Sequence, residues 1–308
     1  MIDNKIACVI VTYNRKKLLK NCLDAIVLQT YKPHTVYIVD NASTDGTMES
    51  VKDWGYYECE NKGIQYKYIL NPKNEGGAGG FYLGMKIAYN TGLFDAIWLM
   101  DDDGTPEKEC LKKLVPYLNR YNYIAPLVLS PFNDNLLSFA YKSSISNKLE
   151  LIEKRAKNGI IESYACPFNG VLYSTNLIAV VGFPNRKMFI WGDENNYDMR
   201  CKKNGFNSIT VIDAIHRHPV NRQEYDVFWG KKVIVIDTHT LWKAYCYYRN
   251  AAYNLYNLYS KWKCFRRYVM MLLYYIFIKK DLEFVRYLTV AWIDGVRGDF
   301  EKLEKYKH

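Results

Sequence analysis

Short apolar runs alternate with amphipathic stretches along the first 130 residues of the chain. Five runs rich in β-branched and aromatic side chains predict strands, at 6–11, 35–39, 65–70, 96–100 and 123–129. Between the first two runs, apolar residues recur at helical spacing; they are Leu18, Leu19, Cys22, Leu23 and Ile26. Strands that alternate with helices predict an α/β fold with a mixed, mostly parallel sheet flanked by helices.

The pattern changes twice after this region. Residues 131–163 are more polar and weakly patterned, with Leu149, Ile152 and Ala156 indicating a short helix, so we interpret them as an insertion. From Leu241 onward the apolar spacing is helical. With 49% hydrophobic and 24% charged residues among 308, the composition is typical of a folded globular protein. We expect one mixed domain over 1–230 and a helical extension over 231–308.

Polar residues follow four of the predicted strands, at the point where each strand ends. These polar segments are 12–15, 40–46, 71–80 and 101–103. In open α/β sheets, ligands bind outside the carboxyl ends of the strands. We therefore expect the four segments to line one crevice.

Asp101, Asp102 and Asp103 form the most informative of these segments. Three adjacent carboxylates repel one another unless a cation or hydrogen-bond donors compensate their charge. Mg²⁺ and Mn²⁺ take oxygen ligands and commonly combine one or two carboxylates with substrate phosphates. The segment therefore predicts a divalent cation bound together with a nucleotide diphosphate. The alternative is an acidic turn that caps the helix begun at Pro106.

Glycine is concentrated between Gly76 and Gly80, where it would let the backbone approach a ligand closely. The segment is not a dinucleotide fingerprint, which requires glycine at Tyr82, or a P-loop, which requires lysine at Met85. A ligand-binding loop and a structural turn before a helix both remain open. Asp40, at the end of the second strand, is a candidate ligand for a base or ribose.

Further candidate groups lie between residues 189 and 218. Asp193 and Glu194 follow an aromatic, apolar stretch, where a carboxylate can have a raised pKa and accept a proton from a hydroxyl. The alternative is compensation of the positive charge at a helix N-terminus. His216 and His218 follow a strand-like run at 209–212, where an imidazole can bind a metal or a phosphate. An incidental position for these histidines is equally open.

The net charge of +10 is concentrated at the C-terminal end. Residues 231–308 contain 15 Lys and Arg against 7 Asp and Glu, together with 18 aromatic residues. This composition is typical of a membrane-surface element. The apolar run 268–278 has 11 residues, whereas a spanning helix needs about 20, so it suits an interfacial helix or a pairing surface between subunits. The absence of a recognition motif argues against a nucleic-acid partner.

The cysteines and the amino terminus indicate the compartment. None of the eight cysteines has C-x-x-C spacing, so we expect reduced, partly buried thiols. Residues 1–5 lead straight into a strand pattern, without the charged and apolar regions of a secretory signal. We therefore expect a cytoplasmic location.

Taken together, these segments resemble the inverting glycosyltransferases of family 2, which have the GT-A (Rossmann-like) fold, over roughly residues 5–225. The matching segments are 9–15, 39–46, 74–80, 99–103 and 193–194. Within the family, segment 74–81 is most similar to galactofuranosyltransferases, which use UDP-galactofuranose. Rhamnosyltransferases of cell-surface polysaccharides are similar as well.

The resemblance implies roles for individual residues. In the metal site, Asp101 and Asp103 would bind Mn²⁺ or Mg²⁺, and His218 would complete the site with His216 as its competitor. Nucleotide-sugar ligands would be Thr12, Tyr13, Asn14, Arg15, Asp40, Asn74, Gly76, Gly77, Gly79, Gly80, Asp101 and Asp102. Of these, Thr12 and Asp40 would hold the base and ribose, and Asp102 the ribose or sugar.

The paired acidic motif implies the catalytic base. Its second member is Glu194, which would remove the proton of the acceptor hydroxyl. Because that member is commonly Asp in the family, Asp193 is the alternative base. Trp191, just before the pair, is the candidate for binding the acceptor.

The implied function is metal-dependent, inverting transfer of a sugar to a hydroxyl of a cell-surface polysaccharide or lipid-linked glycan precursor. The preferred donor is UDP-galactofuranose, with dTDP-rhamnose as the alternative. Residues 1–130 would bind the nucleotide sugar and 131–230 the acceptor. The extension would bind the inner face of the plasma membrane as a peripheral element, or pair subunits in a homo-oligomer. A catalytically silent scaffold of a polysaccharide assembly complex is the alternative of another class.

Overall fold

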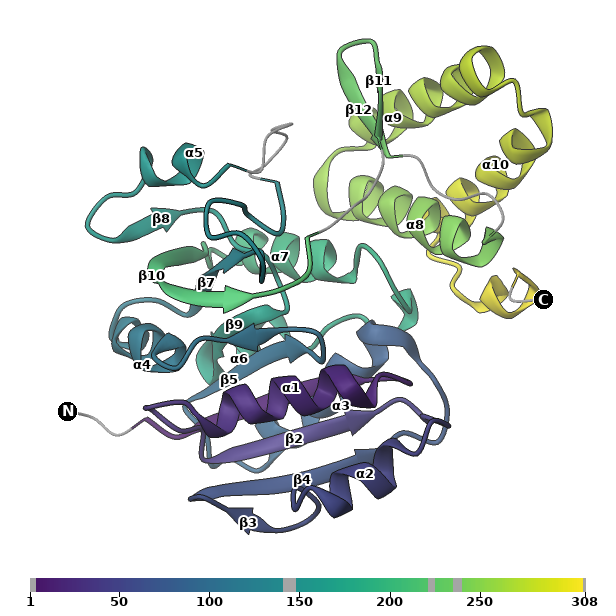
Figure 1. Cartoon of the computed structure of the whole chain (residues 1–308). Helices are drawn as coiled ribbons and strands as arrows, with labels where there is room; N and C mark the ends of the chain where they lie inside the picture. Colours follow the sequence, from purple (N-terminus) through teal and green to yellow (C-terminus); the bar gives the residue numbers. More distant parts are fainter. Residues whose placement is uncertain (1–3, 141–147, 221–224, 235–239, 307–308) are drawn as a thin grey trace. The chain divides into compact units, whose positions relative to one another are not determined.

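The structure is a computed structural model that describes residues 4–140, 148–220, 225–234 and 240–306 (Figure 1). The chain divides into two compact units. The sheet unit comprises 1–186 and 204–221, and the helical unit comprises 187–203 and 222–308. Segment 187–203, which we expected in the mixed domain, therefore groups with the C-terminal helices. The functional division at residue 230 stays a prediction.

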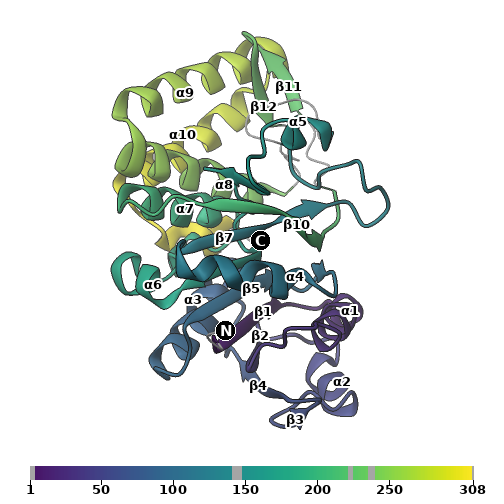
Figure 2. The same cartoon turned by 90° about the vertical axis from the view of Figure 1, so that its left-hand side faces the viewer.

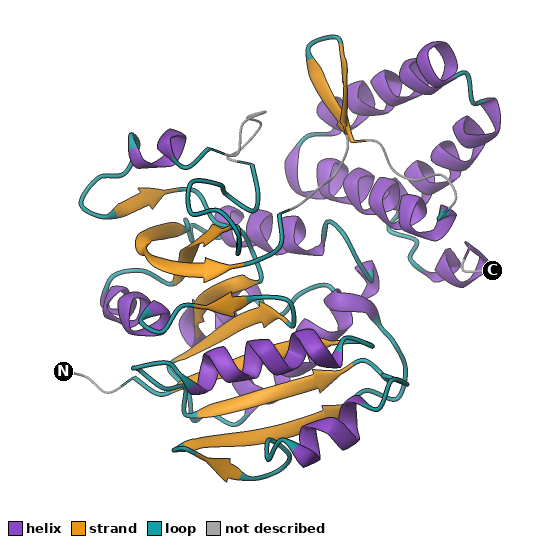
Figure 3. Ribbon diagram, viewed as in Figure 1, coloured by secondary structure: helices purple, strands orange, loops and turns teal. Residues whose placement is uncertain are grey.

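The sheet unit is built on a ten-stranded sheet within the described residues (Figure 3). Its strands are β1 (Ile6–Thr12), β2 (Thr35–Asp40), β3 (Glu60–Asn61), β4 (Ile64–Leu70), β5 (Ala96–Asp101), β6 (Thr105–Pro106), β7 (Tyr123–Leu129), β8 (Ile160–Glu162), β9 (Asn169–Ser174) and β10 (Ile209–Arg217). The order is β3-β4-β2-β1-β5-β9-β7-β10-β6, and β8 also pairs with β10. Strands β4, β2, β1 and β5 are parallel, so their carboxyl ends meet at one edge. All five predicted strands are present, each within one residue of its predicted limits.

Helices cover both faces of this sheet. Side chains of a strand alternate between the two faces, and on one face the even-numbered residues of β1 share a buried cluster with α1 (Lys16–Val27). On the other face lies α3 (Gly76–Asn90), where a Cβ atom at Gly80 would lie 2.4 Å from Val11. Figure 2 shows α1 and α3 on opposite sides of the sheet. The remaining helical segments of this unit are α2 (Thr47–Asp53), α4 (Cys110–Leu114), the 3₁₀ turn Val115–Asn119, α5 (Glu150–Glu153) and α6 (Thr175–Val181).

The helical unit contains the C-terminal helices that the sequence predicts. Its elements are the 3₁₀ turn Arg186–Met188 at the unit boundary, α7 (Asp193–Lys203), β11 (Tyr225–Phe228), β12 (Lys231–Ile234), α8 (Leu241–Asn254), the π-helical turn Leu255–Tyr259, α9 (Lys261–Leu273), the π-helical turn Tyr274–Lys279, α10 (Leu282–Arg297) and the 3₁₀ turn Glu301–Tyr306. Helices α8 and α10 are in close contact at Gly295, where a Cβ atom would lie 2.1 Å from the carbonyl oxygen of Arg249.

The apolar run 268–278 contributes to the core of this unit. Met270, Met271, Tyr274 and Tyr275 are buried among α8 and α10 residues, whereas Phe277 and its neighbour Ile278 are exposed. Much of the run therefore covers this chain's own core. No helix in the described ranges has the length and apolarity needed to cross a bilayer.

Candidate functional site

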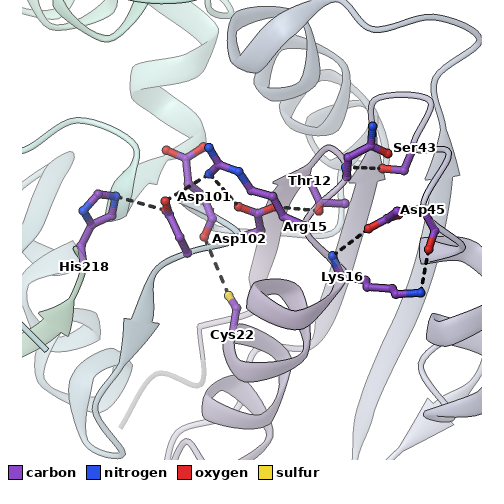
Figure 4. A network of polar contacts seen from close by, with 11 residues as sticks. Thr12, Arg15, Lys16, Cys22, Ser43, Asp45, Asp101, Asp102 and His218 are labelled. Carbon is purple, nitrogen blue, oxygen red and sulfur yellow. Dashed lines mark hydrogen bonds and ion pairs between the residues drawn. The ribbon is translucent and has the colours of Figure 1, made fainter. Parts of the chain in front are cut away.

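The ends of β1 and β5 lie side by side at the centre of the sheet. Val11 of β1 is opposite Asp101 of β5, and the strand order changes direction between these two strands. Such a topological switch point is where open α/β sheets bind ligands. Thr12 Oγ1 donates a hydrogen bond of 2.7 Å to Asp102 Oδ2, and Asp102 is only 3% exposed (Figure 4). Pairing of the two strands therefore fixes a buried carboxylate at the predicted crevice.

The three aspartates carry more negative charge than the protein around them compensates. Arg15 Nη1 lies 3.5 Å from Asp102 Oδ1 and 3.2 Å from Asp103 Oδ2. Burial raises the pKa of Asp102 to about 6, although Thr12 and Arg15 oppose this rise. Burial and the charges of Asp103 and Asp102 raise the pKa of Asp101 well above its usual range. An additional cation would favour the ionised form of all three carboxylates.

His218 faces this acidic segment. Its Nε2 atom lies 3.2 Å from Asp103 Oδ1, and its Nδ1 atom lies 2.7 Å from the carbonyl oxygen of Pro219. Because a carbonyl oxygen only accepts, Nδ1 carries a proton and Nε2 is directed at the carboxylate. Despite burial, this contact raises the pKa of His218, and together with Arg15 it lowers the pKa of Asp103. His218 and Asp103 can therefore form an ion pair when the imidazole is protonated, or bind one cation together when it is neutral.

The fit of this site to a divalent cation depends on two atoms, Asp103 Oδ1 and His218 Nε2. Among the described residues, no three His, Cys, Asp or Glu side chains are arranged to hold a metal ion. However, Asp103 Oδ1 is buried, has no other hydrogen-bond donor among the described residues, and faces His218 Nε2 at 3.2 Å. Figure 4 shows Asp101 next to Arg15 at the same strand end. Two protein ligands fit a Mg²⁺ or Mn²⁺ ion that also binds a diphosphate, because these ions commonly retain waters and substrate phosphates.

His216 has different surroundings from His218. It is fully buried, and Cβ atoms at Gly104 and Gly170 would lie 2.3 Å and 2.8 Å from its ring nitrogens. Neither ring nitrogen has a hydrogen-bond partner in the described part of the chain. Burial lowers the pKa of His216 to about 3, so the ring is neutral. His216 thus fills the space between two glycine backbones.

Hydrogen bonds within the segment after β2, and from β4 and the end of β1, fix its conformation. Asp40 is buried and accepts hydrogen bonds from Ser43 N at 2.8 Å and from the Tyr68 hydroxyl. Asn14, with φ of 53°, donates its N–H to Ser43 Oγ at 2.9 Å. Tyr13, beside it, is exposed. Asp40 and Asn14 therefore shape the edge of the crevice, and their roles as ligands stay predictions.

The glycine-rich segment is the start of α3, so the structure corrects the interpretation of Gly76 to Gly80 as a loop. Asn74 Oδ1 accepts a hydrogen bond of 2.8 Å from Gly76 N just before the helix. A Cβ atom at Gly79 would lie 2.3 Å from the Cβ atom of Glu75, and Gly80 packs on β1, so close packing alone requires both glycines. Gly77 has open space around its Cα atom. Of these glycines, Gly77 retains the clearest room for a ligand.

The paired acidic residues begin α7 in the helical unit. Asp193 is buried, whereas Glu194 and Trp191 are partly exposed. Glu194 Oε2 accepts a hydrogen bond of 2.9 Å from Gly192 N, and Glu194 Oε1 accepts one of 3.0 Å from Asn195 Nδ2. The exposure of Glu194 makes it the more accessible carboxylate of the pair.

Sequence reasoning missed two residues of α8, Asn250 and Asn254, whose side chains bind the backbone of segment 188–192. Their four-residue spacing places them on one face of a helix that is otherwise rich in aromatic residues. The available signal in the sequence was two asparagines four residues apart in a helical pattern rich in aromatic residues.

Comparisons with known proteins identify the family of this chain. Residues 7–174 match the model of glycosyl transferase family 2. The chain is 28% identical over 264 residues to galactofuranosyltransferase GlfT1 of Mycolicibacterium smegmatis, across 83% of this chain and 84% of that protein. It is 30% identical over 230 residues to galactofuranosyltransferase GlfT1 of Mycobacterium tuberculosis, across 73% of each.

A solved structure supports the fold. The mannosyltransferase PcManGT of Pyrobaculum calidifontis, in complex with GDP-Man and Mn²⁺, superposes with a TM-score of 0.51 at 15% identity, across 94% of this chain and 74% of that one. The mostly parallel sheet flanked by helices and followed by C-terminal helices agrees with the predicted architecture. The chain therefore belongs to glycosyl transferase family 2 and is a glycosyltransferase with the GT-A fold.

Proposed function

We propose that this glycosyltransferase transfers galactofuranose from UDP-galactofuranose, with inversion and with a divalent cation, to a hydroxyl of a cell-surface polysaccharide or lipid-linked glycan precursor. The observation that carries the proposal is the acidic segment Asp101–Asp103 at the switch point, where the buried Asp103 Oδ1 faces His218 Nε2 at 3.2 Å. Similarity to two galactofuranosyltransferases supports the sugar. Transfer of rhamnose from dTDP-rhamnose is the alternative.

In this proposal, donor binding uses the strand ends of the sheet unit. Asp103 and His218 would hold Mn²⁺ or Mg²⁺, with Asp101 as the third candidate ligand, and the ion when bound offsets the charge that develops on the departing diphosphate. Asp102, held by Thr12, would accept hydrogen bonds from ribose or sugar hydroxyls. Other candidate donor contacts are Tyr13, Asn14, Asp40, Asn74, Gly76, Gly77, Gly79 and Gly80.

Arg15 would also contact the donor. Its side chain is 53% exposed, and both of its ion pairs with the aspartates are made by Nη1. The guanidinium has five N–H donors in a planar fork, so several remain for phosphate oxygens.

Glu194 would act as the catalytic base. Its carboxylate takes the proton of the acceptor hydroxyl while the hydroxyl oxygen bonds to the anomeric carbon on the face opposite the diphosphate. The bond between that carbon and the diphosphate oxygen breaks with its electron pair, so the nucleotide leaves as UDP and the configuration inverts. General base catalysis contributes roughly 10² to 10⁴-fold to such a step. Asp193 is the alternative base, and Trp191 would contact the acceptor.

Calorimetric titration with several donors tests the proposal. UDP-galactofuranose and dTDP-rhamnose would each be titrated with and without MnCl₂, and transfer to a glycan acceptor would be followed in parallel. We expect cation-dependent binding of UDP-galactofuranose and an inverted product. Binding of dTDP-rhamnose alone would favour the alternative donor. Failure of every nucleotide sugar to bind would favour the silent-scaffold alternative.

Exposed side chains of α9 support binding of the helical unit to an anionic membrane surface on the cytoplasmic side. Trp262 and Phe265 are 64% and 55% exposed, with stacked rings 5.7 Å apart. Lys261, Lys263 and Arg266 are exposed in the same turns. Amphipathic helices with aromatic and basic residues bind such surfaces.

Vesicle flotation tests the membrane proposal. Vesicles with 30% phosphatidylserine should bind the wild type, whereas Trp262→Ser combined with Phe265→Ser should abolish the binding. Unchanged flotation would contradict it. Dimer formation that the same substitutions abolish would favour the pairing of subunits instead.

A further inference from the structure

The backbone just before the proposed base has a conformation that its residues do not favour. Phe189 and Trp191 have φ of 70° and 60°, and Gly192 has φ of 90°. L-amino-acid side chains rarely adopt positive φ, and bulky residues such as these are outliers there. Such residues persist only where the surrounding structure imposes the conformation, and they cluster at functional sites. The contacts that impose it come from α8.

Asn250 makes most of these contacts. Its Nδ2 atom lies 3.0, 3.0 and 2.6 Å from the carbonyl oxygens of residues 188, 190 and 191. One helical turn later, Asn254 Nδ2 donates to the carbonyl oxygen of Gly192 at 2.8 Å. The amide nitrogen of Asn250 carries two hydrogens, so the carbonyl oxygens of residues 188, 190 and 191 share them. Together with Asn254, the two amides lie within hydrogen-bond distance of four of the five carbonyl oxygens of segment 188–192.

Arg249 fixes the orientation of the Asn250 amide. Arg249 Nε donates to Asn250 Oδ1 at 3.1 Å, and Arg249 Nη2 donates to the carbonyl oxygen of Met188 at 2.8 Å. Because Asn250 Oδ1 faces a donor, its nitrogen faces the carbonyl oxygens of the segment. Arg249, Asn250 and Asn254 are all buried, so water does not replace these bonds easily.

Gly192 connects these contacts to the carboxylate of Glu194. Its N–H donates to Glu194 Oε2 at 2.9 Å, while its carbonyl oxygen is bound by Asn254. A Cβ atom at Gly192 would lie 3.1 Å from the Cβ atom of Asn250, so glycine also allows the two segments to approach. The backbone that α8 holds is therefore the backbone that orients the Glu194 side chain.

We propose that Asn250, assisted by Asn254, is a positioning residue for sugar transfer. It holds segment 188–192 so that the Glu194 carboxylate keeps one orientation toward the acceptor hydroxyl. The inference rests on the proposed role of Glu194 as the base. It assigns helix α8, part of the predicted extension, to the catalytic step.

The test compares Asn250→Ala with Asn257→Ala, a control amide on the following turn that is exposed and donates to a backbone carbonyl at 3.1 Å. We expect kcat to fall about 10 to 100-fold in Asn250→Ala, because small displacements of a catalytic group have effects of this order. The KM for the donor should stay within about twofold, and Asn257→Ala should match the wild type. Amide exchange in residues 189–195 should be faster in Asn250→Ala alone, and Asn254→Ala should lose less activity.

Each outcome decides the inference. Wild-type kcat in Asn250→Ala would refute it, as would a rise in the donor KM with unchanged kcat. If Asn250→Ala does not fold, Asn254→Ala decides: reduced kcat with normal donor binding supports the inference, and wild-type kcat refutes it. Glu194→Gln separates the two proposals. An active Glu194→Gln enzyme overturns the base assignment, whereas an inactive one beside a fully active Asn250→Ala overturns only the positioning role.

Discussion

The hydrogen bond between Thr12 and Asp102 offers a direct test of how the crevice is built. Thr12→Val keeps a β-branched side chain in β1 but removes the hydroxyl that donates to Asp102 Oδ2 at 2.7 Å. Asp102 is 3% exposed, so water replaces this donor poorly, and Arg15 at 3.5 Å is the other described donor to this carboxylate. A hydrogen bond to a charged group contributes about 1.5–3 kcal/mol. We expect Thr12→Val to lower the free energy of unfolding of the sheet unit by about this amount.

The same substitution should weaken donor binding. If Asp102 contacts the ribose or sugar, a carboxylate released from Thr12 loses its fixed orientation. A loss of 1.4 kcal/mol corresponds to a tenfold weaker dissociation constant, so we expect about a 10 to 100-fold loss of UDP affinity.

Urea unfolding and calorimetry with UDP and Mn²⁺ measure the two effects of Thr12→Val. Thr12→Ser is the matched control, because it retains the hydroxyl and should stay within about 1 kcal/mol and threefold of the wild type. Wild-type stability and UDP affinity in Thr12→Val would refute the reasoning that this bond organises the site.

Three further predictions concern neighbouring residues. His218→Gln should weaken Mn²⁺ binding in the presence of UDP about 10 to 100-fold, measured by calorimetry, and unchanged affinity would remove His218 from the metal site. Arg15→Met should strengthen binding of Mn²⁺ alone and weaken binding of the nucleotide sugar, because it removes a positive charge from beside the aspartates; changes of opposite sign would contradict this. Gly80→Ala should lower the free energy of unfolding by about 1–3 kcal/mol, because its Cβ atom would lie 2.4 Å from Val11, whereas Gly77→Ala, with open space, should have little effect or stabilise the helix. Equal stability of the two glycine variants would show that packing does not explain Gly80.

The strands could be predicted because each is an apolar run with a polar residue at its end. The start of α3 could not, because glycine is usually unfavourable in helices. Glycine is required at position 80 because Val11 of β1, which is distant in the sequence, packs against it. Local preference predicted a loop, and packing between a helix and a strand decided otherwise.

The two histidines illustrate a second limit of the sequence. The strand that contains His216 was predicted over 209–212, but β10 extends to Arg217 through an irregularity between Val211 and Ile215. His216 therefore belongs to the strand and is buried, whereas His218 lies just after the strand end and contacts Asp103. An interrupted strand carries no clear alternation from which the two positions could be told apart.

The attachment of segment 188–192 to α8 determines where this enzyme can be joined to a relative. A chimera with its junction at residue 230 would combine the 188–192 backbone of one parent with the α8 amides of another. The contacts of the Asn250 and Asn254 amide nitrogens with the carbonyl oxygens of the segment would then join a helix from one parent to a backbone from the other. Exchange of residues 187–203 and 222–308 as one block preserves these pairs, so recombination experiments should keep both segments from the same parent.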